Sequence, residues 1–77
     1  MLNYRVDVPI ENMKGHYTAV QFDNSYLSDE LICWMAENIG FGCWNWDSEL
    51  VWPDRKYYLV FRFKHEEEAM AFKLRWM

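Results

Sequence analysis

The side chains that could carry catalysis in this 77-residue sequence are few and scattered. Candidates for a base, a nucleophile and an acid are His16, His65, Cys33, Cys43, Asp23, Asp47 and Asp54. None stands in a catalytic motif, and the two cysteines form neither a CxxC pair nor a zinc-type spacing with a histidine pair. We therefore predict no enzyme, no catalytic residues, no cofactor and no metal site.

Residues suited to binding are far more abundant, with five each of Trp, Tyr and Phe. A chain that is 52% hydrophobic and 26% charged has the composition of a folded protein, which excludes intrinsic disorder. Eight Lys and Arg against twelve Asp and Glu give a net charge of -4, which argues against nonspecific binding to nucleic acid or anionic lipid.

Length and local composition limit the number of domains and indicate the cellular compartment. We expect residues 1–77 to form one domain, whose small core supplies only about 3 to 5 kcal/mol of net stability, so self-association would help it. The amino end has no apolar core of signal-peptide length, and no apolar run could span a membrane. A cytoplasmic protein with reduced cysteines is the expectation.

The first part of the chain predicts two strands. Residues 2–8 alternate apolar and polar side chains, the period of a half-buried strand, and Pro9 ends it. After a polar connection, residues 16–22 form a second strand, with Thr18 facing the core and Tyr17 facing the opposite side of the sheet.

Two helices are also predicted. The first begins at Ser28, whose hydroxyl can cap it, and ends at Gly40, and an apolar stripe at three- and four-residue spacing lies between them. The second opens at residues 66–68 with three glutamates, which suit the positive end of a helix dipole. Its buried row is expected to contain Ala69, Phe72 and Trp76.

Two further strands complete the pattern. Residues 57–64 alternate clearly, whereas residues 43–52 alternate with an interruption at Ser48 and Glu49. The order predicts an α+β fold with a four-stranded, mainly antiparallel sheet and two helices on one face, a ferredoxin-like arrangement in which the amino-terminal strand replaces the usual last strand. That strand should pair with residues 16–22, and residues 16–22 should lie parallel to residues 57–64 through a right-handed crossover.

Helices on one face leave the other face open, and the alternation predicts which side chains it presents. They are Arg5, Tyr17, Tyr58, Val60 and Arg62, together with either Trp44 and Trp46 or Cys43 and Asn45 from the third strand. Tyr, Trp and Arg are enriched at protein interfaces. We therefore expect a partner-binding face, in which the sites are Arg5, Tyr17, Trp44, Trp46, Tyr58, Val60 and Arg62.

The same face suggests an alternative, since RNA-recognition modules stack bases on aromatic residues of central strands. Lys56 stands where their main motif has a basic residue, and Tyr58 and Val60 stand where it has stacking residues, but Tyr57 and Leu59 replace both of its glycines. Single-stranded RNA or DNA binding is thus the second hypothesis, disfavoured by the net charge.

The stretch YLVFRFKHEEEAMAFKLRW, residues 58–76, resembles the ends of small uncharacterised proteins of tailed phages, including marine ones. The resemblance covers about a quarter of the chain and implies a small accessory protein acting in the host cytoplasm. It implies no catalytic or binding residues. The expected function is therefore a non-catalytic interaction module that forms a homodimer or binds another protein.

Overall fold

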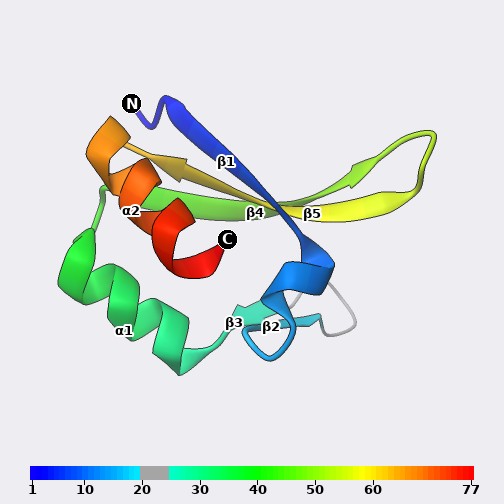
Figure 1. Ribbon diagram of the computed structural model, residues 1–77, viewed down its shortest axis with the longest axis horizontal. Coiled ribbons are helices and arrows are strands. Elements are labelled where there is room, and N and C mark those ends of the chain that lie inside the picture. The colour runs from blue at the N-terminus through cyan, green and yellow to red at the C-terminus, as the bar shows by residue number, and fades with distance from the viewer. Residues whose placement is uncertain (20–24) are drawn as a thin grey trace.

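Two antiparallel sheets and two helices make up the fold, as seen in a computed structural model that describes residues 1–19 and 25–77 (Figure 1). The elements in chain order are β1 (Tyr4–Pro9), the 3-10 helix η1 (Ile10–Met13), β2 (Tyr17–Ala19), β3 (Ser25–Leu27), α1 (Asp29–Asn38), β4 (Trp44–Val51), β5 (Lys56–Phe63) and α2 (Glu66–Trp76). The main sheet has the order β1-β5-β4, and β2 and β3 form a second, two-stranded sheet. The protein is thus a small α+β fold.

The predicted four-stranded ferredoxin-like sheet is wrong. β1 pairs antiparallel with β5, from Tyr4 opposite Phe63 to Pro9 opposite Tyr58, and not with the second strand. This register sets the buried side chains of β1 beside those of β5, the most apolar strand of the chain, so it buries more apolar surface than pairing with the short β2 could. No parallel pair forms among the described strands.

Both helices cover the same face of the main sheet, as predicted (Figure 1). Phe72 of α2 packs on β5, with its ring centroid 4.5 Å from that of Phe61 and 5.2 Å from that of Phe63. Trp34 of α1 meets Phe72 and Trp76 edge to face at 6.3 and 6.1 Å. The core between these layers contains Val6, Val8, Met13, Leu31, Met35, Ile39, Leu59, Phe61, Phe63, Ala69, Phe72 and Trp76.

The helix ends lie where the sequence predicts them. Ser28 caps α1, because its Oγ accepts a hydrogen bond from the Leu31 N–H at 3.2 Å. Gly40 closes α1 at φ +95°, with its N–H donating to the Met35 carbonyl at 2.9 Å. At the start of α2 the His65 N–H donates to Glu68 Oε1 at 3.2 Å, so one glutamate of the acidic turn also serves as a cap.

Two details of the strands differ from the prediction. Tyr17 packs against the core while Thr18 is exposed, the reverse of the expected alternation. β4 runs from Trp44 to Val51 without a break at Ser48 and Glu49, because both pair with β5. The predicted strand at residues 16–22 is seen only as far as Ala19, and its remainder lies outside the described residues.

β4 and β5 continue beyond the end of β1. The last pair with β1 is at Tyr58, whereas β4 and β5 stay paired out to Val51 and Lys56. Residues 50–57 therefore form a two-stranded arm that projects away from the helices, as Figure 1 shows in yellow and yellow-green.

Candidate functional site

Four of the seven predicted contact residues share the uncovered face of the main sheet. Arg5 lies opposite Arg62 in the β1–β5 pairing, and Val60 and Tyr58 follow at alternate positions of β5. Since Leu59, Phe61 and Phe63 are in the core, the intervening even-numbered residues of β5 must face away from the helices. We call this surface the open face.

The other three predicted residues lie on the helix side. Trp44 is opposite Phe63 and Trp46 is opposite Phe61 in the β4–β5 register, so both rings point to the core. Tyr17 joins them there, with its ring 6.0 Å from that of Trp46 in an edge-to-face contact. Of the two options left by the sequence for the third strand, the one that puts Asn45 on the open face is the one observed.

Arg5 is held across the open face by two carboxylates. Its Nε donates to Asp7 Oδ1 at 2.6 Å, and its Nη2 donates to Glu49 Oε2 at 3.0 Å. The hydrogen bond that Arg5 donates to Asp7 is the main reason that the pKa of Arg5 rises above its already high ordinary value. Arg5 and Asp7 are on β1 and Glu49 is on β4, so the Arg5 side chain crosses β5 to reach Glu49.

This crossing explains the burial of Val60, which is 0% exposed although it is absent from the core under the helices. Val60 lies between Asp7 on β1 and Asp47 on β4, in the path of the Arg5 side chain toward Glu49. The aliphatic part of an arginine can cover apolar surface while its charged end stays in water. Val60 is consequently part of the open face but does not offer contact area in the monomer.

The open face carries charges in rows across the strands. The basic row holds the backbone positions of Arg5 and Arg62 beside Asn45, although the Arg5 guanidinium extends out of this row to Asp7 and Glu49. The acidic row lies two residues away along each strand. It holds Asp7 and Asp47 on either side of Val60. Sequence reasoning named Asp47 only as a catalytic candidate and placed neither aspartate nor Glu49 on the partner-binding face, although the alternation that exposed Arg5 also placed Asp7 on its side.

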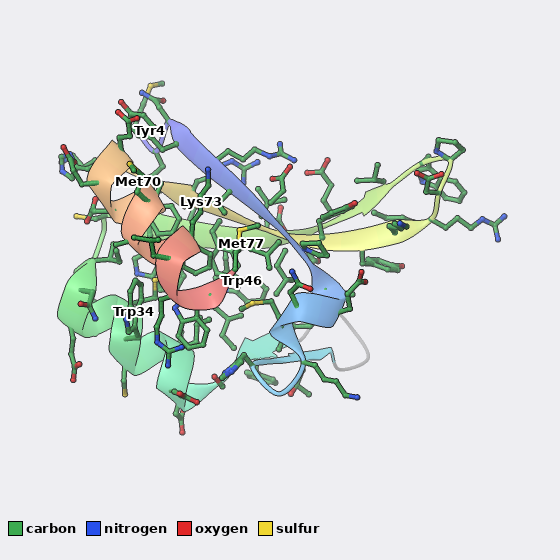
Figure 2. All side chains as sticks on the ribbon, in the orientation of Figure 1. Tyr4, Trp34, Trp46, Met70, Lys73 and Met77 are labelled. Carbon is green, nitrogen blue, oxygen red and sulfur yellow. The ribbon has the colours of Figure 1, made fainter. Side chains whose placement is uncertain are left out.

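A second exposed surface lies on the outer side of α2. Met70, Leu74 and Met77 follow one another at helical spacing and are exposed, Leu74 by 88%. Figure 2 labels Met70 and Lys73 on α2, Met77 at its carboxyl end and Tyr4 at the start of β1. We call Met70, Leu74 and Met77 the α2 patch, and exposed apolar side chains grouped in this way can mark a contact site.

The end of the arm combines exposed rings with positive charge. Trp52 is 63% exposed and Tyr57 is exposed as well. Arg55 lies over the Trp52 ring at 5.3 Å from its centroid, and Lys56 follows it in the chain. The arm therefore offers stacking surfaces next to two cations.

The most enzyme-like cluster surrounds His16. Its Nδ1 is 2.9 Å from Ser28 Oγ and 3.9 Å from Glu30 Oε2, and its ring meets that of Trp76 edge to face at 4.8 Å. Arg75 bonds Glu30 at 3.3 Å and lies 4.4 Å from the Trp76 ring centroid. The buried Trp76 Nε1 has no hydrogen-bond partner among the described groups.

The remaining catalytic candidates do not come together. Cys33 is exposed on α1, Cys43 is half-buried before β4, and both are free thiols. His65 caps α2 and Asp54 lies in the exposed arm, while Asp23 lies outside the described residues. Across residues 1–19 and 25–77, no group of three or more metal-ligating side chains and no pocket is found.

Searches against known proteins and structures add no relative. No family model, no curated protein and no solved structure matches this chain. In the part of the chain that the structure describes, no helix is both long and apolar enough to cross a membrane.

Proposed function

We propose that this protein is a non-catalytic interaction module that uses the open face of its sheet to associate with itself or to bind another protein. The observation that carries the proposal is the asymmetry of the main sheet, in which helices cover one face and the other presents Tyr58 and Arg62, both half-buried, to a partner. Tyrosine and arginine supply much of the binding energy in protein interfaces.

The geometry around His16 supports a structural role for the most enzyme-like cluster. Ser28 Oγ accepts a hydrogen bond from the N–H of Leu31, in the first turn of α1. The same oxygen also contacts His16 Nδ1. The contacts among His16, Glu30 and Arg75 tie the turn before β2 to α1 and α2.

The test is the molar mass of the protein by light scattering in line with size-exclusion chromatography, from about 10 μM to about 1 mM. Tyr58→Ala combined with Arg62→Glu should remove any self-association or partner binding without unfolding the domain. Leu74→Ala on the α2 patch is the matched control on the other side of the molecule. If the double variant keeps every complex that the wild type forms, the open face is not the binding surface.

A second candidate function is binding of single-stranded RNA or DNA, which the arm favours more than the open face does. Trp52 and Tyr57 could stack on bases while Arg55 and Lys56 contact phosphates. This candidate predicts quenching of tryptophan fluorescence by a single-stranded oligonucleotide, weakened by added salt and lost in Trp52→Ala. An unchanged spectrum at low salt would reject it.

We also propose, on the resemblance of residues 58–76 alone, that the protein is a phage accessory protein acting in the host cytoplasm. The prediction is that its gene lies among phage genes and that its product stays in the soluble fraction of infected cells. Fractionation followed by immunodetection tests the location, and recovery in a membrane or extracellular fraction would contradict it.

A further inference from the structure

The charges of the open face are complementary to those of a second copy that is rotated by 180°. Along the strands, the row that holds Arg62 is followed by the acidic row with Asp7 and Asp47, about 6.6 Å away at two residues' rise, while the guanidinium of Arg5 leaves the first row to bond Asp7 and Glu49. A 180° rotation about an axis parallel to the rows, lying between them and in the plane of contact, exchanges the two rows. The basic row of one copy then faces the acidic row of the other.

We infer that the partner of the open face is a second copy of this chain, docked by this two-fold rotation. The inference rests on the proposed function and deepens it, because it selects one partner and one register. Arg62 of each copy stands on the central strand, so it meets its partner's acidic row, where Arg5 already covers Val60 and Asp47 is the carboxylate left to pair with it. A two-fold axis repeats this contact, giving an isologous interface.

The two residues that carry the contact are those whose charges the monomer leaves available. Arg5 and Asp7 are bonded to each other, and Glu49 also bonds Arg5. Arg62 is half-buried and takes part in no ion pair with a described residue, and Asp47 accepts a hydrogen bond only from the neighbouring Ser48 N–H within that set. Arg62 and Asp47 are therefore free to pair between copies.

The area of the open face limits the affinity of the dimer. Three strands about 4.8 Å apart and six paired positions at about 3.3 Å each give a footprint of roughly 300 Å². Stable interfaces usually bury about 800 Å² on each partner, so this dimer should be weak, with a dissociation constant between about 10 μM and 1 mM. Because charge pairs fix its register, added salt should weaken it.

Exchanging the charges of Arg62 and Asp47 tests the register of the two copies. Arg62→Glu sets a carboxylate against the acidic row of the partner, and Asp47→Lys sets an ammonium beside the partner's Arg62, so each change should weaken the dimer by about tenfold or more. The two changes together restore opposite charges across the axis, and the combined variant should regain about tenfold over Arg62→Glu. Sedimentation equilibrium measures all four dissociation constants.

Two control variants carry the same changes of charge elsewhere, Lys14→Glu for Arg62→Glu and Glu37→Lys for Asp47→Lys, at exposed positions away from the open face. Both should dimerise as the wild type does, and near-ultraviolet circular dichroism checks that every variant is folded. Asp47 is exposed, so Asp47→Lys reports on the contact even if Arg62→Glu disturbs the sheet.

The outcomes separate the inference from the proposed function. A wild-type protein that stays monomeric up to about 1 mM overturns the inference. A dimer that Tyr58→Ala removes but the charge variants leave intact keeps the open face as the binding surface and overturns the two-fold register. A dimer unaffected by Tyr58→Ala and by both charge variants overturns the inference and shows that self-association uses another surface.

Discussion

Phe72 of α2 is the residue on which the three packed layers converge. Its ring is buried and contacts Phe61 and Phe63 of β5 and Trp34 of α1. Replacing a buried phenylalanine by alanine costs about 3 to 5 kcal/mol, from lost burial and from the cavity that remains. Since a core of this size supplies about 3 to 5 kcal/mol in total, Phe72→Ala should leave a large fraction of the chain unfolded at 25 °C.

The assay is urea unfolding followed by tryptophan fluorescence and by circular dichroism. Phe72→Leu keeps most of the apolar volume and should lose less than about 1.5 kcal/mol of unfolding free energy, so it gives a measurable value even if Phe72→Ala does not fold. Leu74→Ala, two residues away and exposed, should change the unfolding free energy by less than about 0.5 kcal/mol. Equal losses for Phe72→Ala and Leu74→Ala would refute the assigned packing of α2.

Three further predictions concern single residues. Ser28→Ala should lower the unfolding free energy by about 1 kcal/mol, because the Leu31 N–H loses its cap, whereas Ser28→Thr should keep most of the wild-type unfolding free energy. Equal unfolding free energies of the two variants in urea would contradict the cap. Gly40→Ala should cost about 1 to 2 kcal/mol in the same assay, since φ is +95° and no atom lies within 4 Å of the added Cβ, so backbone strain is the whole cost. Cys33 should react with a maleimide faster than the half-buried Cys43 in the native protein, and peptide mapping by mass spectrometry that found equal rates would argue against the assigned face of α1.

Local patterns were enough to predict where most elements lie. The hydroxyl of Ser28 and the glycine at position 40 mark the ends of α1, and the acidic turn at residues 66–68 marks the start of α2. The alternation in residues 57–64 separated Leu59, Phe61 and Phe63 from Tyr58 and Arg62, but Tyr57, which the same alternation predicted to be in the core, is exposed in the arm. Each of these signals depends on residues within one or two turns of chain, where backbone geometry fixes the direction of every side chain.

The candidate site was predicted in part for the same reason. Arg5, Tyr58, Val60 and Arg62 share the open face because each stands in a strand whose alternation is clear. Trp44 and Trp46 were placed with them only as one of two options, since alternation in β4 gives the period but not which phase faces the core. The register with β5 decides the phase, and it puts both tryptophans under the helices.

The sequence by itself determined the class of fold, the helix ends and the two faces of β1 and β5, because these follow from local periodicity and capping. Only the tertiary structure decided that β1 pairs with β5 and that Arg5 reaches Glu49, 44 residues away along the chain. Strand pairing is a competition among distant segments for buried apolar area, and no short stretch contains its outcome. The rows of charge on the open face follow from that pairing, since neighbours across strands are set by register alone.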